Sequence, residues 1–338
     1  MTLKLKRVSN EPILIPRKHI SWEQDAVLNT AAIYEDGVYH LFYRAVEHPG
    51  WINHNDWTDP SYRYDSCVGH ATSTDGIHFV CKDKPIIQWI SKNGHGTLDF
   101  QDPRITKIDD TYYMVYCIWE NKTTYRAYPG YAISKDLQHW EQKGPLINFD
   151  DFGYNKNAML FPEKINGRFV AFHRPEIAEY RHLPEDDFNW STWSRSSDAK
   201  KDSATGVAVA FSEDLASWLD SKVIMTPRKN LWDNTKIGPG APPIKTDAGW
   251  LNVYHGVDEN HVYRLGISLL DLQDPTRVLK RQEESILEPK MEWEKVGDVN
   301  NVVFTCGAIL QGTQLTVYYG GADTVIGAAK GDIKDFLD

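Results

Sequence analysis

The sequence of 338 residues lacks the features that mark several large classes of protein. It has no apolar run long enough to cross a membrane, and its first residues, MTLKLKRVSNEPILIPR, lack the apolar segment of a signal peptide. It has no Lys/Arg-rich run and a formal net charge of -10, so we expect neither a membrane nor a nucleic-acid partner. The 4 cysteines show neither CxxC nor Cys/His zinc spacing, which predicts free thiols and a reducing, cytoplasmic location.

Common catalytic motifs and helical periodicity are scarce as well. There is no Walker A sequence, Rossmann glycine pattern, HExxH or GxSxG, and we expect no metal and no cofactor. Aromatic residues are abundant instead, with 12 Trp, 17 Tyr and 12 Phe. Such residues favour strands and also form surfaces that bind sugar rings.

Two kinds of strand-like segment alternate along the chain. The first kind, two alternating apolar runs around a short turn, occupies 31–45, 103–119, 160–175, 241–256 and 307–323. The second kind follows each of them, at 68–87, 130–147, 206–225, 263–287 and 324–337. Five such pairs predict an all-β, five-bladed β-propeller that forms a single domain over 1–338, rather than a β-sandwich with a second domain. The last pair is short, and the N-terminal EPILIP (11–16) is expected to supply its outer strand and close the ring.

The turns carry recognisable residues. Asp36-Gly37 and Asn166-Gly167 are hairpin signals, because both central positions tolerate positive φ. Three of the second segments share a Ser-x-Asp sequence that begins at Ser73, Ser134 or Ser212, and its side chains are expected to fix tight turns. The polar, aromatic stretches 46–66 and 176–204 are long enough to be binding loops, or to reach a neighbouring subunit in a homo-oligomer.

Polar residues gather at the ends of the first segments, where propeller sites form. One group is cationic: Arg44, Arg104, Lys156, Arg174, Lys236 and His255. In a chain of net charge -10, such a group predicts a pocket for an anion, although any one arginine is more often part of a salt bridge. If the anion is phosphate and it attacks a glycosidic bond, the reaction needs one general acid and no base, and Asp102 is the candidate acid. The alternative is that Asp102 is a turn residue, because Asp is common before Pro in turns. The remaining candidates are Asn29, Asp65, His173, Tyr263, Asp298 and Asp323.

Long blocks of this sequence resemble glycoside hydrolase family 130, the β-mannoside phosphorylases. The blocks are QDPRITKIDDTYYMVY, LFPEKINGRFVAFHRP, KIGPGAPPIKTDAGWLNVYHG, YRLGISLLDLQDP and CGAILQGTQLTVYYGGADTVIG. The resemblance implies a five-bladed propeller and inverting phosphorolysis that yields α-mannose 1-phosphate. It implies that Asp102 is the general acid, acting through the mannose 3-hydroxyl. It assigns phosphate binding to Arg174, Lys156, His255 and Tyr263, sugar or phosphate binding to Arg104, and a place in the mannose subsite to Asp323. The further candidates for substrate binding, taken from their positions at strand ends, are Asn29, Arg44, Asp65, His173, Lys236 and Asp298.

The chain departs from the family pattern at one position. Many members have Ser-Arg-Ile-Gly where this chain has Ser66-Cys67-Val68-Gly69, so Arg63 or Tyr64 is a candidate replacement for the arginine. The cationic residues favour phosphorolysis over hydrolysis, the activity of some members. The short chain and its loops favour β-1,2-mannobiose or short β-1,2-oligomannan as substrate, with β-1,4-mannosides second. A non-catalytic sugar-binding propeller, with Trp51, Trp57, Trp190 and Trp193 as platforms, is the alternative outside enzymes.

Overall fold

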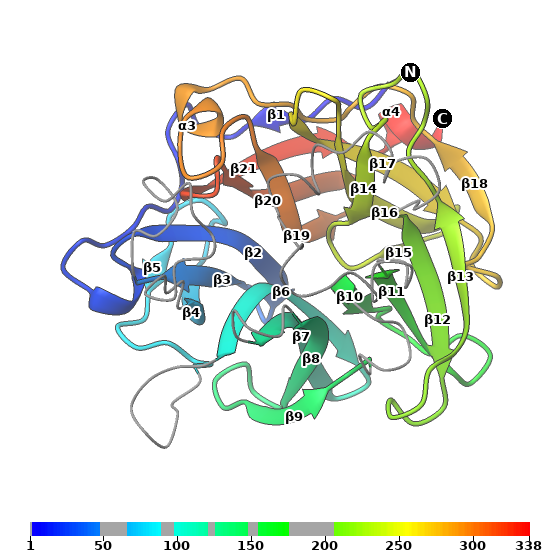
Figure 1. Cartoon of the computed structure of the whole chain (residues 1–338), viewed down its shortest axis with the longest axis horizontal. Coiled ribbons are helices and arrows are strands. Elements are labelled where there is room, and N and C mark those ends of the chain that lie inside the picture. Colours follow the sequence, from blue (N-terminus) through cyan, green and yellow to red (C-terminus); the bar gives the residue numbers. More distant parts are fainter. Residues whose placement is uncertain (1, 48–65, 89–97, 121–125, 148–154, 176–205) are drawn as a thin grey trace, which may run out of the picture.

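The computed structural model describes residues 2–47, 66–88, 98–120, 126–147, 155–175 and 206–338. Its strands form five antiparallel sheets arranged in a ring, each of which we call a blade (Figure 1). From the inner to the outer strand, the blades are β2 (Ala26–Glu35), β3 (Val38–Val46), β4 (Ser66–Ser73) and β5 (Val80–Cys81); β6 (Leu98–Ile108), β7 (Thr111–Glu120), β8 (Arg126–Ser134) and β9 (Glu141–Pro145); β10 (Asn155–Leu160), β11 (Phe169–Pro175), β12 (Val207–Ser212) and β13 (Leu219–Met225); β14 (Lys236–Pro239) with β15 (Ile244–Thr246), β16 (Gly249–Val257), β17 (Tyr263–Leu270) and β18 (Val278–Arg281); and β19 (Val303–Gln311), β20 (Gln314–Gly321), β21 (Val325–Asp332) and β1 (Lys6–Arg7). The prediction of a five-bladed propeller is therefore confirmed.

Helices are few and short in the described residues. They are η1 (Ser21–Glu23), α3 (Glu292–Lys295) and α4 (Lys334–Leu337). None of the helices in this part of the chain has the length and apolar character needed to span a bilayer.

The predicted turns form as expected. Asp36 and Gly37 both have positive φ, as do Asn166 and Gly167. In the first Ser-x-Asp turn, the Ser73 hydroxyl accepts the Gly76 N–H at 3.0 Å, and the Asp75 carboxylate accepts two further backbone N–H groups. Ser134 and Ser212 begin turns with the same bonds. These local bonds fix the connections between the third and fourth strands of three blades.

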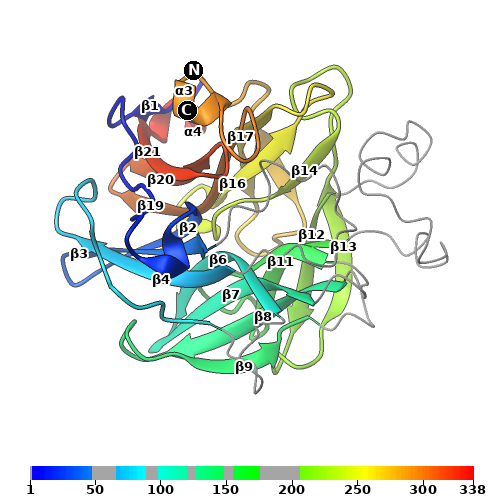
Figure 2. The same ribbon diagram turned by 60° about the vertical axis from the view of Figure 1, so that its left-hand side comes forward.

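The N-terminus closes the ring, although not through the residues that the sequence suggested. β1 pairs with β21 through Lys6 and Arg7, so the chain ends lie side by side on the last blade (Figures 1 and 2). EPILIP (11–16) forms only an isolated bridge from Leu14 to Ile326. Its prolines cannot donate to a ladder, which explains why the paired strand lies further toward the N-terminus.

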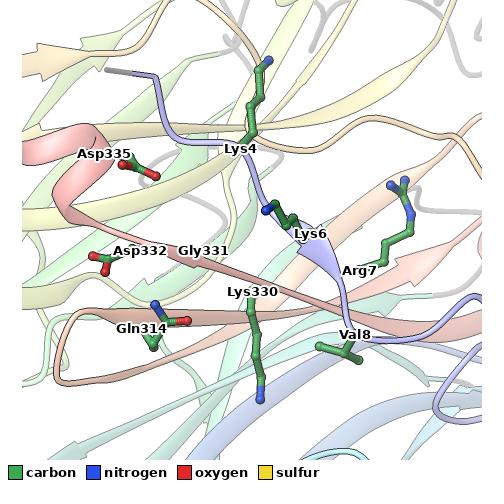
Figure 3. A pocket seen from close by; sticks show the side chains of 9 residues that line it. All are labelled: Lys4, Lys6, Arg7, Val8, Gln314, Lys330, Gly331, Asp332 and Asp335. Atoms are coloured by element: carbon green, nitrogen blue, oxygen red, sulfur yellow. The ribbon is translucent and has the colours of Figure 1, made fainter.

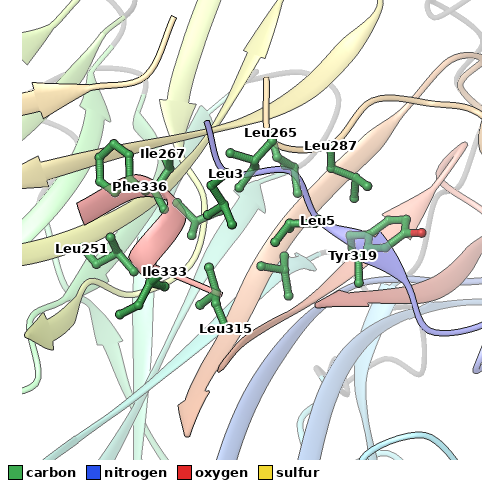
Figure 4. Packing of buried hydrophobic residues seen from close by; sticks show 14 of the residues in the cluster. Leu3, Leu5, Leu251, Leu265, Ile267, Leu287, Leu315, Tyr319, Ile333 and Phe336 are labelled. Atoms are coloured by element: carbon green, nitrogen blue, oxygen red, sulfur yellow. The ribbon is translucent and has the colours of Figure 1, made fainter. Parts of the chain in front are cut away.

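Apolar packing between the last two blades secures this closure. Leu3 and Leu5 lie buried among Leu265 of β17, Leu315 of β20 and Phe336 of α4 (Figure 4). Burial of a leucine side chain contributes about 1.5–3 kcal/mol. Outside this core, lysines on β1 and β21 line a shallow surface hollow together with Asp332 and Asp335 (Figure 3). None of the predicted site residues lines this hollow, and charged side chains of this kind protect an edge strand from pairing with other chains.

The innermost strands of the first three blades share a bulge at a polar residue. The bulges begin at Asn29, Asp102 and Asn157, whose φ angles are 45°, 54° and 55°. Left-handed φ is uncommon outside glycine and is tolerated best by Asn and Asp. The three residues are buried. The same backbone irregularity therefore places Asp102 and two asparagines at equivalent points of three successive blades.

A Trp-acid dipeptide precedes three of the blades and fastens each to its second strand. Trp22-Glu23, Trp232-Asp233 and Trp293-Glu294 stack their indoles on Tyr43, Tyr254 and Tyr319, respectively. Each tyrosine hydroxyl donates to the neighbouring acid, at 2.6, 3.0 and 2.7 Å. Each acid also pairs with arginine: Arg17, Arg228 with Arg281, or Arg7. We refer to these groups as the blade clasps.

Loss of one clasp acid is expected to destabilise the protein. Glu294 is fully buried and accepts bonds from Arg7, Tyr319 and two backbone N–H groups. Glu294→Gln leaves Arg7 without its anion, and we expect a loss of about 3 kcal/mol in the free energy of unfolding, measured with urea. Glu292→Gln changes an exposed residue of the same helix and should cost no more than about 0.5 kcal/mol. Equal stability of the two variants would contradict the role of the clasp.

Candidate active site

Asp102 is held in place by a hydrogen bond from the first blade. The Asn29 amide donates to Asp102 Oδ1 at 2.8 Å. Gly320 on β20 makes room for this asparagine, because a Cβ at Gly320 would lie 2.5 Å from Asn29 Oδ1. One oxygen of the predicted acid is thereby fixed, and three blades take part in fixing it.

Arg44 lies beside Asp102 in the same half of the site. Its guanidinium donates to Ser66 Oγ at 3.2 Å and to Asp99 Oδ2 at 3.4 Å, and it lies 3.8 Å from Asp102 Oδ1. Arg44, Ser66, Asp99 and Asp102 are all buried. A buried cation is thus shared between two aspartates.

Two further predicted residues, Asp323 and Asp298, complete an acidic half of the site. Burial, followed by the Asp102 carboxylate, raises the pKa of Asp323 to about 7. Burial, followed by Asp25, raises the pKa of Asp298 to about 6. Asp323 has left-handed φ, and Asp298 Oδ2 is buried without a hydrogen-bond partner among the described residues. Near neutral pH, Asp323 is therefore able to carry a proton and to donate a hydrogen bond.

The raised pKa of Asp323 predicts a pH-dependent effect on stability. Its pKa in the folded state lies above the unfolded value near 4, so its contribution to stability is lost as pH rises from about 4 to 7. Asp323→Asn removes this penalty, and we expect the melting temperature of the variant, relative to the wild type, to be higher at pH 8 than at pH 4. The exposed Asp110→Asn should show no such trend. A difference independent of pH would contradict the assignment.

The fourth and third blades supply a cationic half. Lys236 Nζ lies 3.2 Å from the Tyr263 hydroxyl, and the Tyr263 ring stacks on His255 with centroids 6.4 Å apart. A Cβ at Gly238 would lie 2.6 Å from the His255 ring and 3.1 Å from Arg174 Cδ, so this glycine lets both side chains approach. Three of the predicted phosphate ligands therefore meet, together with Lys236, which was predicted to bind the substrate.

The pKa of His255 reflects its burial and the nearby cations of this half. It is fully buried, and neither ring nitrogen makes a hydrogen bond of normal geometry with the described residues. Burial, followed by Arg174, Lys236 and Arg104, holds the pKa of His255 well below its ordinary value. A neutral imidazole has one N–H to donate and adds no charge of its own. Together with the surrounding cations, it can therefore bind an anion.

Lys156 and Arg104 connect the two halves. Lys156 is the register partner of Arg174, and its ammonium lies 4.4 Å from the centroid of a Trp119 ring. Arg104 donates to the carbonyls of Gly240 at 2.7 Å and Asp102 at 2.8 Å, and lies 3.4 Å from the Pro239 carbonyl. Arg104 therefore joins the second blade to the fourth across the channel; its predicted contact with sugar or phosphate stays a prediction.

The structure does not bring every predicted residue to the site. His173 is adjacent to Arg174 on the strand, so its side chain lies on the opposite face. Its Nε2 lies 2.9 Å from Ser221 Oγ, and burial lowers the pKa of His173 to about 3. Asp65, Arg63, Tyr64 and most of 46–66 and 176–204, with Trp51, Trp57, Trp190 and Trp193, lie outside the described residues. Cys67 packs in an apolar cluster with Tyr43 and Val27. On β4, the strand that contains Cys67, the residue that accepts a hydrogen bond from Arg44 is Ser66.

Three residues of the site were missed from the sequence. Asp99 lies 3 residues before Asp102, between the apolar residues Leu98 and Phe100, and this placement was the only sequence signal for its burial. Gly238 and Gly320 had only their Gly-Pro and Gly-Gly neighbours as a signal. In the described part of the chain, no three His, Cys, Asp or Glu side chains form an arrangement that could hold a metal.

A five-bladed propeller with a buried Asp102 and a cluster of cations around His255 has the residue types that an enzyme acting on glycosidic bonds with an anionic nucleophile needs. The chain belongs to glycoside hydrolase family 130, whose family model, described as beta-1,4-mannooligosaccharide phosphorylase, matches residues 4–338. The predicted family and the class of enzyme, a hexosyl-transferring phosphorylase, are thereby confirmed.

Individual relatives are similar over nearly the whole chain. The chain is 42% identical to the 1,2-beta-oligomannan phosphorylase of Thermoanaerobacter sp. (strain X514), over 98% of this chain and 99% of the relative. It is also 42% identical to the beta-1,2-mannobiose phosphorylase of the same strain, over 96% of each. The solved beta-1,2-mannobiose phosphorylase from Listeria innocua, in complex with beta-1,2-mannobiose, superposes with a TM-score of 0.79 at 29% identity and 98% coverage of both chains.

Proposed function

We propose that the protein is an inverting phosphorylase that cleaves β-1,2-mannobiose or short β-1,2-mannooligosaccharides with inorganic phosphate. The products are α-D-mannose 1-phosphate and mannose, or the shortened oligosaccharide. The observation that carries this proposal is the cluster of the cations Arg174, Lys236 and Arg104 around the buried, neutral His255, with Arg104 bonded to the Asp102 carbonyl. The names of the relatives with 42% identity support the β-1,2 linkage.

In this proposal, Asp102 gives its proton to the leaving oxygen through the mannose 3-hydroxyl, as the family resemblance implies. Phosphate attacks the anomeric carbon from the opposite face, so the bond to the leaving sugar breaks as the bond to phosphate forms. The hydrogen phosphate ion carries one proton, which it gives up after its oxygen has bonded to the anomeric carbon. This proton returns to Asp102, so the enzyme is restored at the end of the reaction. Because phosphate is already an anion at neutral pH, no general base is required.

The proposed ligands divide between the two halves of the site. Arg174, Lys156, Lys236, His255 and Tyr263 bind phosphate, by charge or by hydrogen bonding. Asn29, Arg44, Asp298 and Asp323 face the mannoside. The phosphate ion is a co-substrate, and we propose that no metal or organic cofactor takes part.

Hydrolysis on the same fold is the main competing function, and the cationic residues argue against it. A hydrolase needs a second carboxylate to activate water, whereas the charged groups that act on the buried His255 are the cations Arg174, Lys236 and Arg104. A sugar-binding propeller without catalysis has no use for such a cluster of cations. Isothermal titration with phosphate alone tests this alternative, because a lectin gives no reason for phosphate binding.

A linkage assay tests the proposed substrate. β-1,2-mannobiose, β-1,4-mannobiose and 4-O-β-mannosylglucose are compared at equal concentration with phosphate, and α-mannose 1-phosphate is measured. We expect the highest kcat/KM for the β-1,2 compound. A preference for either β-1,4 compound would overturn the linkage while leaving phosphorolysis intact.

We also propose a cytoplasmic location, in which the free thiols of Cys67, Cys81, Cys117 and Cys306 stay reduced. Residues 1–338 are proposed to act as one domain. A homo-oligomer stays a prediction, which light scattering of the purified protein tests.

A further inference from the structure

Asp99 is a buried carboxylate that the reaction scheme leaves without a role. It accepts the Ser66 N–H at 3.1 Å, together with bonds from Ser66 Oγ, Gln101 and Arg44. Burial raises the pKa of Asp99, and Arg44, Ser66 and Gln101 act against that rise. Donors that converge on one carboxylate favour its ionised form. The strand thus carries a second carboxyl group, held by Arg44, Ser66 and Gln101, beside the proposed acid.

The position of Arg44 connects Asp99 to Asp102. The guanidinium lies 3.4 Å from Asp99 Oδ2 and 3.8 Å from Asp102 Oδ1, so it is closer to the residue that does no chemistry. A cation in full contact with a carboxylic acid favours loss of its proton. An acid that must give a proton to a leaving group works best when a neighbouring cation is held away from it.

We propose that Asp99 is a positioning residue for the cleavage: it draws the Arg44 guanidinium toward itself and thereby keeps Asp102 able to hold the proton that it donates. This inference rests on the proposed function. The charged and titratable groups that face Asp102 are Arg44 from β3, Asp99 and Arg104 from β6, Cys117 from β7, Cys306 from β19 and Asp323 after β20. Two further charged groups act on these neighbours: Lys156 on Asp99, and Asp298 on Asp323. Arg104 is bonded to carbonyls and Lys156 acts on Asp99 through its charge, whereas Arg44 is the cation that donates a hydrogen bond to Asp99.

The test is the pH profile of kcat/KM for β-1,2-mannobiose with saturating phosphate. In Asp99→Asn, Arg44 is expected to close on Asp102 and to move the alkaline limb to lower pH by about one unit. Asp99→Glu, which keeps the charge, should restore most of the wild-type profile. Asp109→Asn, an exposed change on the turn after the same strand, is the matched control and should leave the profile unchanged. Phosphate itself changes its protonation state in this pH range, equally for all variants. The quantity compared is therefore the shift of the alkaline limb between each variant and the wild type.

The outcomes separate this inference from the proposed function. If the wild type forms no mannose 1-phosphate, the proposed function fails. If the wild type is active and folded Asp99→Asn keeps its alkaline limb, the role of Asp99 is overturned, as it is if Asp99→Glu shifts the limb equally. A buried asparagine sometimes prevents folding, so Asp99→Ser serves as a second neutral variant, with thermal unfolding as the check. A neutral variant that changes only KM, with an unshifted limb, also contradicts the proposal.

Discussion

Asp102→Asn is expected to lower kcat for phosphorolysis by about 10²–10⁴-fold without loss of the fold. The amide cannot supply a proton to the leaving oxygen, and general acid catalysis contributes rate factors of this size. Asparagine tolerates the left-handed φ of 54° at this bulge and accepts the bond from Asn29, so the melting temperature should change little. The measurement is initial rate and circular dichroism on the same preparation.

The matched control for this variant is Asp109→Asn. Asp109 also has left-handed φ, at 52°, but it is exposed on the turn between β6 and β7. It should keep wild-type kcat. If Asp102→Asn retained activity within about threefold of the control, Asp102 would not be the acid.

The second large effect concerns phosphate. Arg174→Ala is expected to raise the KM for phosphate about 10- to 100-fold, because a charge-assisted hydrogen bond of about 1.5–3 kcal/mol is lost. The KM for the mannoside should change much less. The variant leaves Lys236 and His255 in place, so phosphate binding weakens but is not abolished.

Arg168→Ala is the control for Arg174→Ala. Arg168 lies just before the same strand and pairs with Asp220 at the surface, at 3.1 Å. Both KM values of this control should match the wild type. An equal rise of both KM values in Arg174→Ala would show a general loss of site geometry and would contradict a phosphate ligand.

The repeat pattern predicted the blades because paired hairpins repeat along the chain. It did not predict where the innermost strands begin, since the bulges at Asn29, Asp102 and Asn157 interrupt the alternation of strand residues. β2 begins at Ala26 and β6 at Leu98, each 5 residues before the segments starting at 31 and 103 that the pattern marked. The bulges that break the alternation of strand residues are therefore the positions at which the buried Asn29, Asp102 and Asn157 lie.

The site was predictable in its composition and less so in its internal roles. Cationic residues at strand ends in an acidic chain indicated the anion pocket, and Arg174, Lys236, His255 and Tyr263 do come together. Strand alternation explains why adjacent His173 does not join them. The bonds of Arg104 to carbonyls of another blade, and of Asp99 to Arg44, join residues distant in sequence and could not be inferred from local pattern.

The clasps show a different limit. The Trp-acid dipeptides at Trp22, Trp232 and Trp293 were visible in the sequence, but their partners lie 20, 21 and 25 residues away from each acid. The pairing of the first two long strands within each blade brings each tyrosine beside its tryptophan. Part of the aromatic excess is therefore explained by blade packing.

Product analysis with and without phosphate tests the central claim most directly. β-1,2-mannobiose is incubated with the wild type in phosphate and in a phosphate-free buffer, and the products are followed by ³¹P and ¹H NMR. Phosphorolysis predicts equal amounts of α-mannose 1-phosphate and mannose with phosphate, and no cleavage without it. Release of free mannose as the only product in the phosphate-free buffer would contradict it.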